Sequence, residues 1–144
     1  RNILAKLSKN PEASLRDLSK ELEIPLSTLS YRVKALEEKH ALIGYVFMIE
    51  PRNFEHNAFR IYLSLRGITP EVKEALFKFA MNHPNVTYLI EWLGNWQYCF
   101  GIIAPEVGTV TKIVNQINDG FGTSVNKIEL VPVLRDLKMN FFPA

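Results

Sequence analysis

Pro25 interrupts the helical pattern of the first third of the chain, and this break most constrains the fold. Proline lacks a backbone N–H and holds the preceding residue in an extended conformation, so one helix must end there and another begin. Ser14 and Asp17 have the spacing of an N-terminal capping box for the first helix. Apolar residues recur at helical spacing on both sides of the break: Leu15, Leu18 and Leu22 before it, and Leu26, Leu29, Val33 and Leu36 after it. Two short helices joined by a three-residue turn predict a helix-turn-helix.

The second helix, expected over 26–39 with its four apolar residues turned inward, carries a polar face near its start. The outward side chains are Ser27, Thr28, Ser30, Tyr31, Arg32 and Lys34. In helix-turn-helix proteins this end enters the major groove of DNA. Arg32 has the fork that pairs with guanine O6 and N7 or with a phosphate, whereas Lys34 suits a phosphate as a point charge. Other roles stay open, because Ser27 and Thr28 could cap the helix and Tyr31 could pack locally.

The segment after this helix is first apolar and then polar. Residues 41–51, "ALIGYVFMIEP", are apolar, β-branched and aromatic, and predict a strand that ends at Pro51. Residues 51–57, "PRNFEHN", are polar and predict a linker. We therefore expect a DNA-binding domain over 1–50 that includes this trailing strand, a linker over 51–57 and a second domain over 58–144.

The second domain is expected to alternate strands and helices. "FRIYLSLR" alternates apolar and polar residues as a half-buried strand does, and Thr69 followed by Pro70 marks the start of a helix that ends before Pro84. Gly94-Asn95 predicts a two-residue hairpin turn between strands over 86–93 and 96–103. A helix over 106–119 and a strand over 126–142 complete the order. The expected fold class is α+β: a winged helix-turn-helix followed by a ferredoxin-like βαββαβ domain.

Composition limits the functions to consider. The net charge of +2 is small for a nucleic-acid binder, so DNA binding would need a local basic face or a dimer. The single cysteine, Cys99, cannot form an internal disulfide, and the longest apolar runs are far too short to span a bilayer, which together predict a cytoplasmic protein with no membrane association. The three histidines have no ligand partner at helical spacing and no phosphate-binding glycine motif occurs, so we expect no enzyme activity, no metal and no cofactor.

The stretch 10–45, "NPEASLRDLSKELEIPLSTLSYRVKALEEKHALIGY", resembles the DNA-binding signature of the Lrp/AsnC (feast/famine) family of transcription regulators. The pairs that carry the resemblance are Ser27-Thr28, Arg32-Val33, Leu36-Glu37 and Gly44-Tyr45. The ending "LKMNFFP" resembles a subset of larger, chiefly archaeal relatives with two helix-turn-helix units, and we expect residues upstream of Arg1. The resemblance implies that 26–39 is the recognition helix, that the C-terminal domains form dimers and often octamers, and that a small ligand such as an amino acid binds between them.

The resemblance also directs attention to the loop "LGNWQY". The family's turn here commonly reads Gly-x-x-Asp and lies near the ligand site, which makes Gly94, Asn95, Trp96 and Gln97 the candidate effector-binding residues. Gly94 matches, but Gln97 stands at the Asp position, where a carboxylate would hold an α-amino group. This argues against amino-acid binding of the usual kind. In the alternative interpretation, Gly94-Asn95 only turns a hairpin while Trp92 and Trp96 pack the sheet or an oligomer interface.

These observations predict a sequence-specific transcription regulator that binds double-stranded DNA as a dimer or higher homo-oligomer and responds to a small ligand. The alternative is a ligand-sensing or protein-interaction module whose helix-turn-helix is vestigial. Some Lrp-like relatives are sirohaem decarboxylases, but the chain does not resemble their tetrapyrrole-binding motifs.

Overall fold

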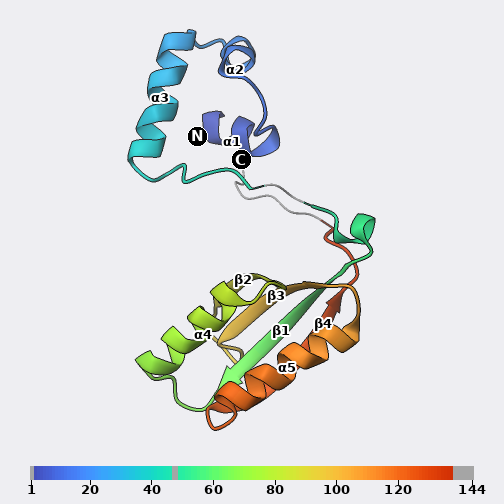
Figure 1. Ribbon diagram of the computed structural model, residues 1–144. Helices are drawn as coiled ribbons and strands as arrows, with labels where there is room; N and C mark the ends of the chain where they lie inside the picture. The colour runs from blue at the N-terminus through green and yellow to red at the C-terminus, as the bar shows by residue number, and fades with distance from the viewer. Residues whose placement is uncertain (1, 47–48, 138–144) are drawn as a thin grey trace. The chain divides into compact units, whose positions relative to one another are not determined.

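The computed structural model describes residues 2–46 and 49–137, and it divides into two compact units (Figure 1). Of the described residues, the first contains 2–46 and Leu137, and the second contains Ile49–Asp136. Each has its own cluster of buried apolar side chains, so each is described by itself. In the described part of the chain, we find no helix with the length and apolar character to cross a membrane.

The first unit consists of three helices: α1 (Asn2–Lys9), α2 (Leu15–Glu21) and α3 (Leu26–Glu38). Its buried core is Ile3, Leu7, Leu18, Leu29 and Val33. The expected burial of Leu29 and Val33 is confirmed, and Leu36 packs against them while partly buried. The expected burial of Leu26 is wrong, because 42% of this residue is exposed. Leu26 is the first residue of α3 and precedes the turn of the helix that packs into the core.

Local hydrogen bonds fix the start of α2 and the turn into α3. Ser14 is confirmed as the N-cap of α2, since its Oγ accepts from the Asp17 N–H at 3.1 Å. The second bond of the pair runs from the Ser14 hydroxyl to Asp17 Oδ2 at 2.6 Å. In the turn, Glu23 adopts a left-handed conformation with φ of 54°, and the Ser19 hydroxyl donates to the Ile24 carbonyl at 2.6 Å. The two helices are thus held at a defined turn, as the proline break predicts.

The strand expected over 41–51 is wrong for the residues that the structure describes. Residues 41–46 and 49–50 are in no strand, Pro51–Phe54 form a short 3-10 helix (η1), and residues 47–48 lie outside the described part. Ile43 is 89% exposed and Val46 is 72% exposed. A strand requires a hydrogen-bonded neighbour, and the four-stranded sheet contains no strand from this segment. Part of the expected linker over 51–57 therefore has regular structure, and the following strand already begins at Asn57.

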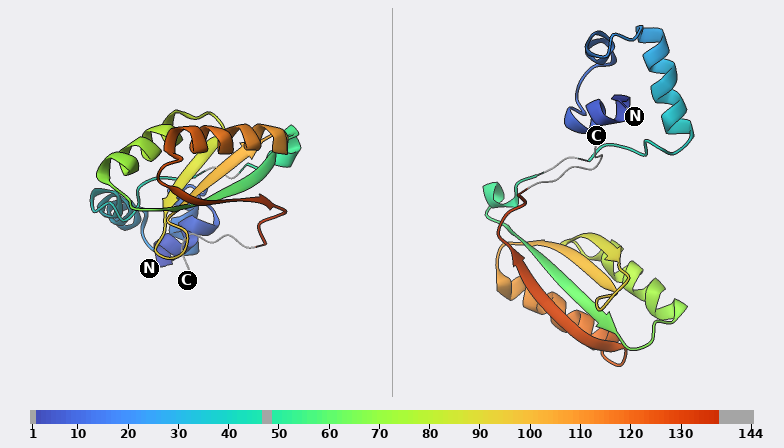
Figure 2. Two further views of the ribbon diagram at one scale, coloured as in Figure 1. Left: turned by 90° about the horizontal axis from the view of Figure 1, so that it is seen from below. Right: turned by 180° about the vertical axis from the view of Figure 1, so that it is seen from behind.

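The second unit has the expected βαββαβ order. Its elements are β1 (Asn57–Leu65), α4 (Pro70–Asn82), β2 (Val86–Glu91), β3 (Tyr98–Ala104), α5 (Val107–Phe121) and β4 (Val125–Val133). The sheet order is β2-β3-β1-β4, and every neighbouring pair is antiparallel. Both helices lie on one face of the sheet, as Figure 2 shows from two sides. The α+β architecture with a ferredoxin-like second domain is confirmed.

The main core lies between the sheet and its helices. Alternate residues of β1 point into it, and Ile61 and Leu63 are fully buried together with Phe100 of β3 and Leu76 of α4. Thr69 caps α4 by accepting from the Val72 N–H at 3.4 Å, as the Thr-Pro pair predicts. The opposite face of the sheet is covered by no helix of this unit, and we call it the helix-free face.

Two strand boundaries differ from expectation. Glu91 pairs with Tyr98, and the Trp92 N–H donates to the Gln97 carbonyl at 2.7 Å, so β2 and β3 are joined by a four-residue loop, 93–96, rather than by a two-residue turn. The last strand, expected over 126–142, ends at Val133, and residues 134–137 are in no strand. Residues 138–144, which carry most of the "LKMNFFP" resemblance, lie outside the described part, as does Arg1.

Candidate recognition helix and effector pocket

The outer surface of α3 carries the six side chains that the sequence singled out. All are exposed except Thr28, which is half-buried. Ser27, Tyr31 and Lys34 are spaced four and three residues apart, so they lie on one stripe of the helix. Tyr31 is 74% exposed. Such a stripe is the part of the helix that can reach into a groove of another molecule.

Arg32 lies on the flank of α3 rather than on this stripe. It lines a hollow of about 490 Å³ together with Tyr31 and Lys39 of the same segment and Asn2 and Ile3 of α1. The Lys34 ammonium group lies 3.9 Å from a Glu38 carboxylate oxygen, and both side chains are exposed. Exposed pairs of this kind contribute little, so Lys34 can exchange this partner for a phosphate.

The N-terminus of α3 has no side-chain cap. Pro25 is the N-cap residue and makes no such hydrogen bond, whereas Ser27 and Thr28 are the second and third residues of the helix. The suggestion that Ser27 or Thr28 caps α3 therefore finds no support in the described residues. The first N–H groups of a helix have no acceptor within it, and the dipole of this 13-residue helix favours an anion such as phosphate at this end.

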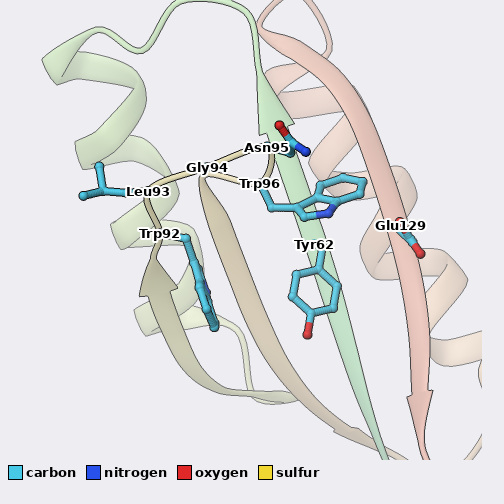
Figure 3. Close-up of a pocket in the computed structure, with 7 residues that line it drawn as sticks. All are labelled: Tyr62, Trp92, Leu93, Gly94, Asn95, Trp96 and Glu129. Carbon is cyan, nitrogen blue, oxygen red and sulfur yellow. The ribbon is translucent and has the colours of Figure 1, made fainter.

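A second hollow lies on the helix-free face of the sheet, beside the β2–β3 loop (Figure 3). It has a volume of about 360 Å³ and is lined by Tyr62, Trp92, Leu93, Gly94, Asn95, Trp96 and Glu129. Three of the four residues expected to bind an effector, Gly94, Asn95 and Trp96, line this pocket, whereas Gln97 does not. The structure adds Tyr62, Trp92 and Glu129 as lining residues.

The side chain of Gln97 is used to hold the loop. Its Oε1 accepts from the Leu65 N–H at 2.8 Å, and its Nε2 donates to the Gly94 carbonyl at 3.0 Å. Both polar atoms of the amide are therefore engaged within the protein. Figure 3 shows the loop of residues 92–96 turning above the sheet, with Trp92 and Trp96 on different sides of it.

Comparisons with known proteins bear on the first unit and on the fold of the chain. Residues 1–41 match the family model of winged helix-turn-helix DNA-binding domains. No curated protein matches the chain significantly. A transcriptional regulator from Neisseria meningitidis, solved as a complex with L-Met, superposes with a TM-score of 0.82 at 19% identity over 98% of this chain and 92% of that chain. An AsnC family transcriptional regulator from Agrobacterium tumefaciens gives 0.81 at 12% identity over 99% and 92%, and LrpC from B. subtilis gives 0.77 at 15% over 95% and 93%.

The chain has the fold of the Lrp/AsnC transcription regulators. In this Lrp/AsnC fold, the residues that match the DNA-binding family contain all of α1, α2 and α3, so α3 is the second helix of the helix-turn-helix. The remaining elements form the ferredoxin-like unit that carries the pocket beside Trp96.

Proposed function

We propose that this chain is a sequence-specific DNA-binding transcription regulator in which α3 is the recognition helix. The observation that carries the proposal is the exposed polar stripe of α3 next to a helix N-terminus with no side-chain cap. A stripe of hydrogen-bonding side chains can contact base edges, while the N-terminal N–H groups and a lysine position the helix on phosphates. We assign the chain no catalytic role, and a regulator of this kind acts in the cytoplasm.

The side chains divide into two roles by their position on α3. Ser27, Ser30 and Tyr31 face outward near the start of the helix and are proposed to contact base edges, with Thr28 beside them. Lys34 lies one turn further along and is proposed to pair with a phosphate. Arg32 lies on the flank of α3 beside α1, where its guanidinium group can make two parallel hydrogen bonds to a guanine or to a backbone phosphate.

The proposed DNA-binding function requires a homo-oligomer. One chain has a net charge of only +2, and two chains double the basic surface available for phosphates. We propose that the ferredoxin-like units pair, which presents two copies of α3 to half-sites about 34 Å apart. Light scattering on the purified protein tests this directly, since a monomer at micromolar concentration would contradict it.

We further propose that the pocket beside the β2–β3 loop holds a small effector. It offers a hollow lined mostly by apolar and aromatic groups with few polar ones, which is the usual character of a ligand site. The Neisseria meningitidis regulator was solved with L-Met. In this chain the amide of Gln97 is engaged in the loop and no carboxylate stands at that position, so an ordinary amino acid is a poor fit.

The deciding experiment selects genomic DNA fragments on the purified protein at low salt and then measures the affinity for the selected sequence. Arg32→Ala should weaken binding by about 1–3 kcal/mol if the fork reads a base. Lys34→Gln should lower the slope of log affinity against log salt by about 0.9 per phosphate contact. Lys20→Gln, an exposed lysine of α2, is the matched control for Lys34. Failure to enrich any sequence would favour a protein-interaction role for the first unit.

A further inference from the structure

The pocket on the helix-free face of the sheet is built largely from aromatic rings. Tyr62 comes from β1, Trp92 directly follows β2 and Trp96 belongs to the loop. The Tyr62 and Trp96 ring centroids are 6.0 Å apart with their planes tilted by 47°. Figure 3 shows the Trp92 ring standing apart from these two across the hollow. The pocket therefore presents ring faces from two sides to anything that enters it.

The charge of the lining is negative. Among the residues that the structure describes, Glu129 is the only charged one that lines the pocket, and the β1–β4 register places it directly opposite Tyr62. Its side chain is 47% exposed, so the carboxylate can reach a ligand from the rim. The faces of aromatic rings carry partial negative charge, so a cation held over them is attracted.

Lys127 already lies close to one of these rings and to Glu129. The Lys127 ammonium nitrogen lies 4.8 Å from the centroid of the Trp96 ring and 3.8 Å from a Glu129 carboxylate oxygen. The side chain of Lys127 is 64% exposed and does not line the pocket itself. Trp96 and Glu129 thus form a place where positive charge collects, and an exposed lysine is easily displaced from it.

We propose that this pocket binds an organic cation of the alkylammonium class. Three rings and one carboxylate match a compact, weakly hydrated cation whose charge is spread over methyl groups. A zwitterion fits less well, because its carboxylate would meet Glu129 while the amide of Gln97 is engaged with Leu65 and Gly94. This inference specifies the effector class within the proposed function, and it does not depend on DNA binding.

Both tryptophans of the chain line the pocket, so tryptophan fluorescence excited selectively reports on it. The experiment titrates the full protein, without DNA, with choline chloride, with sodium chloride at equal concentration, and with 3,3-dimethylbutan-1-ol, in which a neutral carbon replaces the ammonium nitrogen. We expect a saturable change in emission with choline, at least five-fold weaker binding of the neutral alcohol, and no saturable change with the salt. L-Met should bind more weakly than choline. Equal binding of the alcohol, or tighter binding of L-Met, would overturn the proposal.

Variants then assign the binding to the named groups. Glu129→Gln and Trp96→Leu should each weaken choline binding by about two- to five-fold. Lys127→Met should strengthen it, because the Glu129 carboxylate then loses the lysine that it pairs with. Glu74→Gln and Phe77→Leu, on the exposed side of α4, are the matched controls for the carboxylate and the ring. Choline affinity that is unchanged in both Glu129→Gln and Trp96→Leu would place the cation elsewhere. DNA affinity measured on the same samples is expected to stay intact, which separates failure of this inference from failure of the DNA-binding proposal.

Discussion

Replacing Gln97 by Glu tests whether this side chain works as a structural clamp of the β2–β3 loop. Glu has almost the same shape and keeps an acceptor for the Leu65 N–H, which lies 2.8 Å from the present Oε1. It cannot, when ionised, donate to the Gly94 carbonyl as Nε2 does at 3.0 Å. A carboxylate oxygen would instead face a carbonyl oxygen. The loss of one hydrogen bond and the new repulsion together predict a destabilisation of about 1–3 kcal/mol at pH 7.

The pH dependence makes the test sharper. The carboxylate is disfavoured in the folded variant, so the pKa of Glu at position 97 would lie above its unfolded value of about 4.3. A raised folded pKa gives stability that is present below the unfolded pKa and is lost as the pH rises through the folded pKa. In its protonated form the side chain can again donate to the Gly94 carbonyl. The stability difference from the wild-type protein should therefore shrink between pH 7 and pH 4.

Urea unfolding followed by tryptophan fluorescence measures this difference, because both tryptophans lie beside the loop in the second unit. Gln97→Met is the control: it has similar length, loses both hydrogen bonds and leaves the N–H of buried Leu65 without its partner. Its cost should be about 1–3 kcal/mol and should not depend on pH. Wild-type stability for Gln97→Glu at pH 7, or a difference that does not change on acidification, would refute the clamp.

Three further outcomes are expected. Leu29→Ala, at a fully buried core position of the first unit, should destabilise that unit by about 2–5 kcal/mol in thermal unfolding followed by circular dichroism, and a loss below 1 kcal/mol would contradict the described core. Ser14→Ala removes the acceptor of the Asp17 N–H and should cost about 0.5–2 kcal/mol in the same assay, with Ser8→Ala as control. The hydrogen bond from Lys73 lowers the pKa of the Glu91 carboxyl. The stability that this ion pair contributes is present above the ordinary glutamate pKa and is lost as the pH falls through the lowered pKa of Glu91. The urea midpoint of Glu91→Gln should therefore differ from that of the wild type at pH 7 and converge with it at pH 3.

Features that depend on neighbouring residues in sequence could be predicted. The N-cap at Ser14, the Thr69-Pro70 start of α4 and the alternation along β1 rest on local backbone chemistry and on periodicity, and the structure contains each of them. The apolar character of residues 41–51 is equally visible, but a strand exists only where a partner offers its N–H and carbonyl groups. Composition cannot show that partner, and none pairs with this segment in the described residues.

The pocket, too, could be predicted only in the part that depends on residues close in sequence. The loop that carries Gly94 and Trp96 could be found from the sequence, because glycine and asparagine mark a turn between two strands. Tyr62 alternates with Ile61 and Leu63 in "FRIYLSLR", so the pattern of this strand places it on the face opposite to theirs. Glu129 could not be assigned, since its place beside Tyr62 depends on the register of β1 with β4, which no local pattern determines. The predicted burial of Leu26 is wrong for a related reason. The spacing of apolar residues shows which face of a helix is buried, but it does not show at which residue the contact with another helix begins.

The pairing of β1 with β4 also sets the order in which the protein can fold as it is made. Ala58 pairs with Val133, so β1 cannot complete its pairing until Val133 has been made, whereas α1, α2 and α3 contact residues close in sequence. Local contacts form fast and distant ones slowly. At ribosomal speeds of about 5–20 residues per second, the interval between the synthesis of α3 and that of Val133 is roughly 5–20 s. During that time a nascent chain carries a completed helix-turn-helix ahead of an unfinished sheet, so truncation before Val125 should leave the first fold intact and the second unable to close.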